Sequence, residues 1–169
     1  MTHPQHNLIL DKEQIQQKVI RMAYEIYEQN FEEQTLVLAG IYRNGYTLAG
    51  MLVTELEKIS PINVTLLQIT LDKTAPLQAP VTLSPEGAAL EDAVVILVDD
   101  VLNTGRTLAY ALDAFLQHNP RKIEIATLVN RHHTLFPVAA TYTGYSLATT
   151  LRERVDVVLQ EDEVAAYLH

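Results

Sequence analysis

The sequence contains no cysteine, which excludes disulfide bonds and thiolate zinc sites and is typical of a cytoplasmic protein. It also has no apolar run that approaches the roughly 20 residues of a membrane-spanning helix. The first ten residues, MTHPQHNLIL, lack the basic start and the long apolar core of a secretory signal peptide. We therefore expect a cytoplasmic protein that does not interact with membranes.

Basic residues are scarce as well. The chain has 12 Lys and Arg against 21 Asp and Glu, a net charge of −9, and its longest basic run is Arg121-Lys122. Nucleic-acid-binding proteins usually carry a basic stripe or cluster, so this balance argues against an RNA or DNA partner. The argument is weak, because folding can gather distant arginines onto one face.

The 169 residues fit a single domain, 1–169, with a sizeable core. Hydrophobic periodicity predicts strands over 7–10, 35–40, 63–71, 93–98, 123–129 and 154–160, the last as the final core strand. It predicts helices over 46–59 and 107–118, a short one over 165–169, and one capped by Asp11 and Gln14 with the apolar stripe Ile15, Val19, Met22, Ala23 and Ile26. Segment 72–92 holds three prolines and Gly87, so we expect mostly loop there.

Strands that alternate with helices predict an α/β fold with a central, mostly parallel sheet flanked by helices. Apolar runs such as AVVILV (93–98) suit strands that are covered on both faces. Ligands of such sheets bind outside the carboxyl ends of the strands. We therefore expect segments 41–45, 99–107 and 130–133 to meet in one crevice.

The stretch DDVLNTGRT (99–107) follows the most hydrophobic strand. Asp99 and Asp100 would repel each other and resist burial, so they need hydroxyl groups or a hydrated cation as partners. The loop that follows opens a helix, whose N-terminus attracts anions, and Gly105 lets the backbone come close to a ligand. Thr104, Thr107 and Arg106 add hydroxyl donors and a positive charge. This combination suits a sugar phosphate, with the carboxylates on the hydroxyls and the loop on the phosphate.

Each residue of the stretch also has a plainer interpretation. Asp100 or Thr104 could simply cap a helix, and Gly105 could simply turn the chain. The combination after an apolar strand favours a functional site. The stretch contains neither GxxxxGK nor GxGxxG, so a P-loop and a dinucleotide fingerprint are excluded.

VVILVDDVLNTGRT resembles the phosphoribosyl pyrophosphate (PRPP) signature of type I phosphoribosyltransferases. The likeness extends to the bifunctional pyrimidine operon attenuator and uracil phosphoribosyltransferase family. It covers almost the whole chain, including NLILDKEQIQQKVIRMAYEI, LAGIYRNGYTLAGML and ATLVNRHHTLFPVAATYTGYSLATT. The resemblance implies the type I phosphoribosyltransferase fold, with a small hood over the site, and a homo-oligomer.

The resemblance also implies a role for each matching position. Asp99 and Asp100 would hold the ribose hydroxyls. The 5′-phosphate would lie in the PRPP-binding loop, formed by Leu102, Asn103, Thr104, Gly105, Arg106 and Thr107. The backbone of Tyr42, Arg43 and Asn44 would face pyrophosphate, and Asn130 and Arg131 would meet the base. Mg²⁺ would be carried by PRPP, with Asp99 and Asp100 as its candidate protein ligands. The implied reaction is transfer of ribose 5-phosphate to a nucleobase, uracil or a related pyrimidine, with release of pyrophosphate.

The chain departs from the family pattern at three places. Segment 72–92 has no arginine and one lysine, Lys73; Asn130 stands where an aspartate is usual; and TGYSLATT lacks the usual lysine and proline. These departures support a second hypothesis, a catalytically weak regulator that senses PRPP or a nucleoside monophosphate and binds RNA, although the acidic balance disfavours RNA. A third hypothesis is a sugar-phosphate-binding fold that is kept for self-assembly.

Overall fold

The structure is a computed structural model that describes residues 7–72, 74–75 and 80–169. The elements of these residues are β1 (Asn7–Leu10), α1 (Lys12–Asn30), β2 (Thr35–Ile41), α2 (Asn44–Ile59), β3 (Asn63–Thr70), β4 (Thr82–Ser84), β5 (Val94–Leu102), α3 (Arg106–Leu116), β6 (Lys122–Asn130), β7 (Tyr142–Ser146), β8 (Val155–Leu159) and β9 (Val164–Leu168). Lys73, the lysine of segment 72–92, lies outside the described residues.

The central sheet has the strand order β4-β3-β2-β5-β6-β7. Strand β4 runs antiparallel to β3, and every other neighbouring pair is parallel. Strand β5 lies in the middle, and all of its residues except Asp100 are buried. The predicted α/β fold with a mostly parallel sheet is thereby confirmed.

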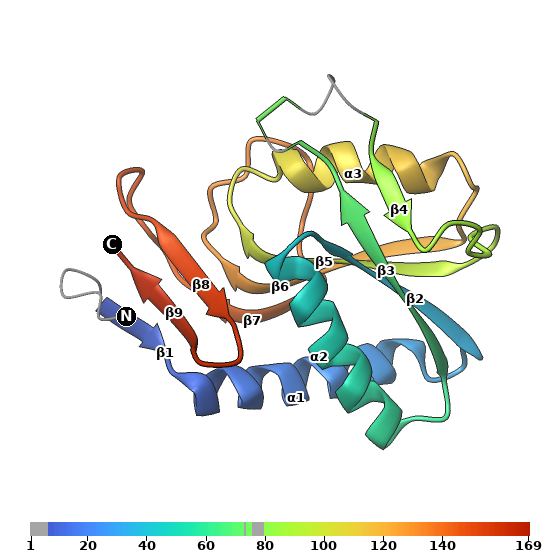
Figure 1. Ribbon diagram of the computed structural model, residues 1–169, viewed down its shortest axis with the longest axis horizontal. Helices are drawn as coiled ribbons and strands as arrows, with labels where there is room; N and C mark the ends of the chain where they lie inside the picture. Colours follow the sequence, from blue (N-terminus) through green and yellow to red (C-terminus); the bar gives the residue numbers. More distant parts are fainter. Residues whose placement is uncertain (1–6, 73, 76–79) are drawn as a thin grey trace.

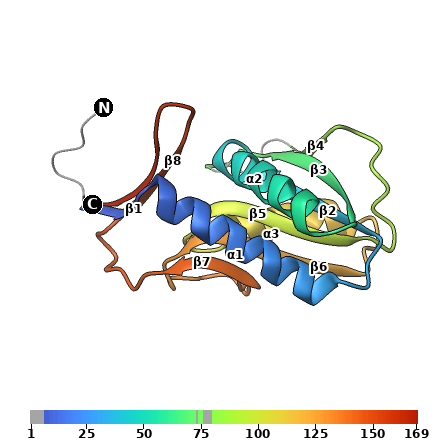
Figure 2. The ribbon, with the colours of Figure 1, turned by 90° about the horizontal axis from the view of Figure 1, so that it is seen from below.

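Helices cover both faces of this sheet: α1 and α2 pack on one, and α3 packs on the other (Figures 1 and 2). Asp11 and Gln14 form the predicted capping box at the start of α1, and the predicted apolar stripe of that helix is buried. Side chains of β5 alternate between two apolar clusters, with Ile96 in the cluster beneath α1 and α2 and Leu97 in the cluster beneath α3. In the described ranges, no helix combines the length and the apolar composition that a membrane span requires.

A second, three-stranded sheet of order β1-β9-β8 stands at one end of the central sheet, and we call it the hood sheet (Figure 1). The prediction that 154–160 forms the last core strand was wrong, because β8 pairs with β9 in the hood sheet. The predicted helix over 165–169 was also wrong. These residues lie largely in β9, which pairs on both sides, and an isolated helix of five residues has too few hydrogen bonds to be stable.

Two strands of the central sheet were not predicted. Strand β4 falls in segment 72–92, whose prolines weaken a strand signal, and it pairs only with β3 at the sheet edge. Strand β7 contains Gly144, where an added Cβ would lie 2.7 Å from the Leu128 carbonyl oxygen and 3.3 Å from Met22 Sδ. The glycine therefore weakens the sequence signal while it lets α1 pack closely on this edge.

Candidate functional site

Strands β2, β5 and β6 are parallel neighbours, so their carboxyl ends lie at one edge of the sheet. The loop after β2 packs directly on β5, because a Cβ added to Gly45 would lie 2.6 Å from the Val98 carbonyl oxygen. The chain after β6 is tied to the end of β5, where the Arg131 backbone N–H donates to the Leu102 carbonyl at 3.2 Å. The structure thus brings segments 41–45, 99–107 and 130–133 together.

Asp99 and Asp100 lie inside β5 rather than after it, since the strand continues to pair with β6 as far as Leu102. Asp99 is only 4% exposed, whereas Asp100 is partly exposed. The Asp100 backbone N–H donates to Asp99 Oδ1 at 2.9 Å, and the Val101 backbone N–H donates to Asp100 Oδ1 at 2.8 Å. Asn44 Nδ2 donates to Asp100 Oδ2 at 3.0 Å. Of the two carboxylates, Asp100 is the more accessible to a ligand.

The loop between β5 and α3 is shaped by Gly105. Its φ of +84° lies in the left-handed region, and an added Cβ would lie 2.3 Å from Val138 Cγ2. Gly105 is also the N-cap of α3, so it supplies no capping side chain to the first turn of that helix. Thr104 Oγ1 accepts a hydrogen bond from the Arg106 backbone N–H at 3.3 Å. Residues 99–108 line a hollow of about 110 Å³ around this helix N-terminus.

The predicted PRPP-binding residues differ in what they can offer to that hollow. Leu102 is buried at 2% exposure and contributes only its backbone. Asn103 and Arg106 are exposed, and Thr104 and Thr107 are partly exposed. Free N–H groups at a helix N-terminus, hydroxyl donors and a guanidinium are suited to an anion.

The loop after β2 faces the other side of Asp100. Its Tyr42–Arg43 peptide bond is cis, and the Arg43 guanidinium lies 5.5 Å from the centre of the Tyr42 ring. Together with Asn44, these residues line a hollow of about 510 Å³. Asp100 forms another wall of this hollow, and Val157, Val158 and Gln160 close it from the hood side.

Arg131 uses its guanidinium to hold neighbouring loops. Nη1 donates to Asn103 Oδ1 at 2.6 Å, Nε donates to Thr149 Oγ1 at 3.1 Å, and Nη2 donates to the Glu153 carbonyl at 2.5 Å. Asn130 Oδ1 accepts a hydrogen bond from the His132 backbone N–H at 3.0 Å. The structure therefore places both predicted base-site residues at the crevice, and it gives Arg131 a clear part in fixing the loop that carries Asn103.

Segment 149–153 forms the far wall of this region. His133 Nε2 is hydrogen-bonded to Thr149, and the Thr150 backbone N–H donates to Glu153 Oε1 at 2.6 Å. The hydrogen bonds from the backbone and side chain of Thr150 lower the pKa of Glu153, and the positive charge of Arg131 contributes less. Within the described ranges, no group of three or more His, Asp and Glu side chains gathers closely enough to hold a metal ion by itself.

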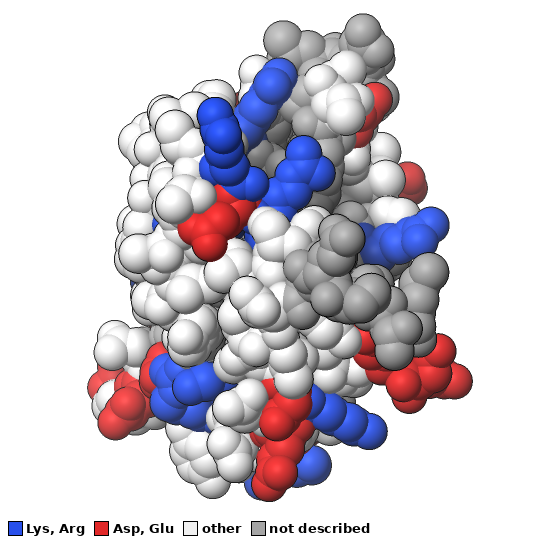
Figure 3. Space-filling view, turned by 90° about the vertical axis from the view of Figure 1, so that its left-hand side faces the viewer, with Lys and Arg blue, Asp and Glu red and all other residues white. Residues whose placement is uncertain are grey.

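Charge is unevenly distributed on the side of the molecule that bears the hood sheet. Figure 3 shows Lys and Arg side chains gathered in the upper half of this view, while basic and acidic side chains alternate in the lower half. A local excess of positive charge attracts phosphate-bearing ligands even when the whole protein is acidic.

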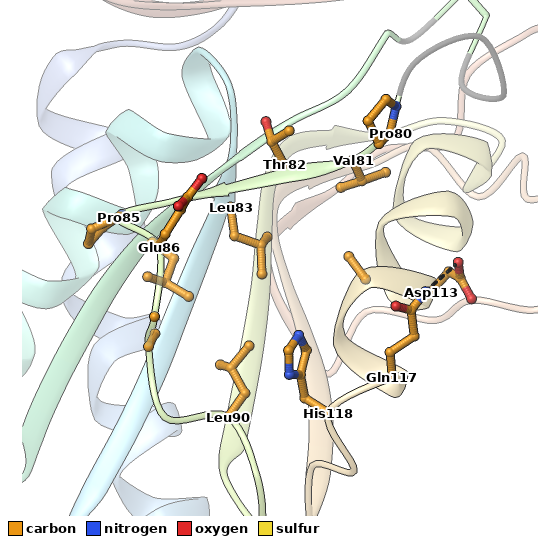
Figure 4. A pocket seen from close by; sticks show the side chains of 14 residues that line it. Pro80, Val81, Thr82, Leu83, Pro85, Glu86, Leu90, Asp113, Gln117 and His118 are labelled. Atoms are coloured by element: carbon orange, nitrogen blue, oxygen red, sulfur yellow. Dashed lines mark hydrogen bonds between the residues drawn. The ribbon is translucent and has the colours of Figure 1, made fainter.

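A third hollow, also of about 510 Å³, lies away from these residues, between β4, the chain that follows it and the second half of α3 (Figure 4). Val81, Leu83 and Leu90 give it an apolar wall, and Asp113, Gln117 and His118 line it from the helix side. The described residues that line it include no Lys or Arg and none of the predicted site residues. It therefore lacks the positively charged side chains found at the carboxyl ends of the strands.

Sequence reasoning missed two contributions to the crevice. One is the wall formed by Val157, Val158 and Gln160, because a strand signal does not reveal which sheet the strand joins. The other is the side chain of Asn44, for which only a backbone role was predicted. Its position at the start of a helix after a strand was the available signal, but its partners are more than 50 residues away.

Comparison with known proteins adds to this geometry. Residues 6–160 match the family described as the phosphoribosyl transferase domain. The chain belongs to the phosphoribosyltransferase family. The predicted family is thereby confirmed, and the strand-loop-helix of residues 94–116 is part of a phosphoribosyltransferase domain.

Relatives and solved structures agree with this assignment. The chain is 41% identical to the bifunctional protein PyrR of Pelotomaculum thermopropionicum over 90% of this chain and 88% of the relative. It is 40% identical to the bifunctional protein PyrR of Oceanobacillus iheyensis, over 94% and 96% respectively. A hypoxanthine-guanine phosphoribosyltransferase of Bacillus anthracis shares the fold with a TM-score of 0.70 and 23% identity, over 83% of this chain and 82% of that one. A hypoxanthine phosphoribosyltransferase of Trypanosoma cruzi gives 0.72 and 17%, over 83% and 81%.

Proposed function

We propose that this phosphoribosyltransferase domain transfers ribose 5-phosphate from PRPP to a pyrimidine base, uracil or a close relative, and releases pyrophosphate. The observation that carries the proposal is the hollow of residues 99–108, which combines the Asp99 and Asp100 carboxylates with the N-terminus of α3. A ribose 5-phosphate needs both kinds of group within one sugar length. The pyrimidine rests on the 41% identity to a bifunctional protein PyrR.

The loop from Asn103 to Thr107 is proposed to hold the 5′-phosphate. The first turn of α3 has N–H groups that its N-cap Gly105 does not cap with a side chain, and the helix dipole favours an anion there. Thr104, Arg106 and Thr107 add donors around the same hollow.

The carboxylates are proposed to accept hydrogen bonds from the ribose hydroxyls. Asp100 is the more accessible of the two, and its oxygens already accept hydrogen bonds from Asn44 and the Val101 backbone. Each carboxylate oxygen has two lone pairs, so Asp100 retains capacity for a hydroxyl donor. Their negative charge would also stabilise the positive charge that develops on the sugar as its bond to pyrophosphate breaks.

Mg²⁺ fits this arrangement as an ion that the ligand largely carries. Asp99 and Asp100 are hard oxygen donors of the kind Mg²⁺ prefers, and the described residues offer no third acidic or histidine ligand beside them. When bound, the ion would supply positive charge to the pyrophosphate oxygens. Asp99 and Asp100 are the residues that would hold it together with PRPP.

The larger hollow beside Asp100 is proposed to take the pyrophosphate and the reacting end of the sugar. The bond between the anomeric carbon and a pyrophosphate oxygen breaks, and the electron pair leaves with pyrophosphate. A ring nitrogen of the base forms the new bond to carbon and loses its proton. Arg43 lines the same hollow and offers a cation to the leaving group. Asn130 and Arg131 at the end of β6 are proposed to lie on the base side.

The direct test is release of pyrophosphate from Mg-PRPP in the presence of uracil and a panel of other bases. Uracil-dependent release would support the proposal, and the absence of release with every base would contradict it. The double variant Asp99→Asn/Asp100→Asn should bind Mg-PRPP more weakly than the wild type. The matched control is Asp113→Asn, which removes an exposed carboxylate of α3 from the remote hollow and should leave affinity unchanged.

A second candidate function is a nucleotide-sensing regulator that binds RNA. The basic side chains gathered on one face and the similarity to relatives named bifunctional favour it. RNA binding through phosphate contacts would give an affinity that falls steeply with salt, because bound counterions are released. A salt titration with RNA tests this function, and no binding at low salt would refute it.

A further inference from the structure

Asn44 is the first residue of α2, and its side chain bridges the two sheets of the protein. Its Nδ2 donates to Asp100 Oδ2 at 3.0 Å and to the Val157 carbonyl oxygen at 2.8 Å. Asp100 belongs to β5 of the central sheet, and Val157 belongs to β8 of the hood sheet. An amide nitrogen carries two hydrogens, so these two bonds use its full donor capacity.

The backbone of this bridge is held firmly on β5. The residue after Asn44 is Gly45, where an added Cβ would lie 2.6 Å from the Val98 carbonyl oxygen and 3.1 Å from the Asp99 Cα. The start of α2 therefore cannot move away from the acidic residues without losing close packing. From this fixed point the Asn44 side chain reaches the hood strand.

The same bridge sets the orientation of the Asp100 carboxylate. Asn44 binds Oδ2, and the Val101 backbone N–H binds Oδ1 at 2.8 Å, so each oxygen has one donor within the protein. With both oxygens held, the carboxylate has one preferred orientation, and its remaining lone pairs point to fixed places. A carboxylate that awaits two ribose hydroxyls benefits from such preorganisation, because binding then costs less ordering.

We propose that Asn44 is a positioning residue, which orients Asp100 for the ribose hydroxyls of PRPP and couples that carboxylate to the hood strand β8. The proposal rests on the proposed function as far as the ribose is concerned. The link to the hood does not depend on it. A purely structural Asn44 would anchor the hood without acting through Asp100.

A double-mutant cycle separates these roles. Asn44→Ala should weaken Mg-PRPP binding by about tenfold, the effect of losing one hydrogen bond to a charged group. In an Asp100→Ala background the same change should have less than a twofold effect, because the acceptor is already gone. Equal effects of Asn44→Ala in both backgrounds would overturn the positioning role. Thr54→Ala, on the exposed side of α2, is the control for helix stability.

Asn44→Asp gives a readout that a merely structural residue would not move. It places a second carboxylate against Asp100, and two like charges at this distance favour the form that shares one proton. The charged groups around the pair are Asp99 on β5 and Arg43 in the adjacent loop. Mg-PRPP binding by Asn44→Asp should therefore weaken as the pH rises, by a step that the wild type lacks. Thr54→Asp adds the same charge elsewhere on α2, and an identical pH profile for both variants would overturn the proposal.

Hydrogen exchange tests the link to the hood without any ligand. In the free protein, Asn44→Ala should speed amide exchange across 155–168 relative to the wild type, while Thr54→Ala should not. Unchanged exchange in Asn44→Ala would overturn the coupling. If the wild type does not bind Mg-PRPP, the proposed function and the ribose part fail together, and the exchange result still decides the hood link. Far-UV circular dichroism confirms that each variant is folded.

Discussion

Replacing Gly105 with alanine should destabilise the protein by about 2–4 kcal/mol and weaken Mg-PRPP binding. One part of this cost is conformational. Gly105 has a φ of +84°, where an L side chain costs about 1–2 kcal/mol, and alanine recovers about 0.4–1 kcal/mol by restricting the unfolded chain. The net conformational penalty is about 1 kcal/mol.

The other part is steric. The new Cβ would lie 2.3 Å from Val138 Cγ2, far inside contact distance. Val138 is 8% exposed and belongs to the apolar cluster beneath α3, so it has little room to move. Overpacking of this kind costs about 1–3 kcal/mol. Displacing Val138 would also disturb the segment that packs on the phosphate loop, which is why we expect affinity to fall.

The chain contains a matched control for this experiment. Gly87 has a φ of +81°, and a Cβ added there meets nothing within 4 Å. Gly87→Ala should therefore lose only the conformational part, about 1 kcal/mol. Urea unfolding followed by far-UV circular dichroism measures both variants. The steric reasoning is refuted if Gly105→Ala is destabilised no more than Gly87→Ala, or if adding Val138→Ala to Gly105→Ala gives no relief.

Three further predictions concern buried and bridging groups. Tyr142→Phe should lose about 1–3 kcal/mol in urea unfolding, because the Tyr142 hydroxyl donates to Glu124 at 2.9 Å and accepts from Asn30 at 3.1 Å, and both partners are buried. Burial, together with the nearby Glu124 carboxylate, raises the pKa of Tyr142 above its ordinary value of 10.0. The wild type should therefore lose stability as the pH rises above that value, since the unfolded chain releases the phenolic proton first, and a decline of equal size in Tyr142→Phe would contradict this cause. Arg131→Lys should weaken Mg-PRPP binding by about tenfold, because one ammonium cannot replace a guanidinium that spans Asn103 and segment 149–153, and unchanged affinity in a binding titration would count against this bracing role.

The elements whose signal is local were predictable from the sequence. The capping box at Asp11 and the apolar stripe of α1 are set by neighbouring residues, and the structure has both. The buried strand that ends in Asp99 and Asp100 was recognisable because a run of aliphatic residues has few stable places outside a covered sheet. The phosphate loop was recognisable for a similar reason, since all of its groups lie within nine consecutive residues.

Elements that depend on distant partners were misjudged. Residues 155–159 alternate between buried and exposed positions, which predicts a strand but not its sheet, and the partner strand β9 decides that it belongs to the hood. Residues 164–168 are apolar and short, so their pairing on both sides, rather than their own propensity, makes them a strand. The strand signal of β7 is weakened by Gly144, whose value is a close contact with α1.

The sequence by itself determined the family, the α/β fold and the groups that suit a sugar phosphate, because these depend on residues that are close together in the chain. Only the tertiary structure decided that Asp99 is buried while Asp100 is accessible. It also decided that Arg131 braces the phosphate loop and that Asn44 joins Asp100 to the hood. The physical reason is that burial and long-range hydrogen bonds arise where segments separated by many residues meet, and no local pattern records which segments those will be.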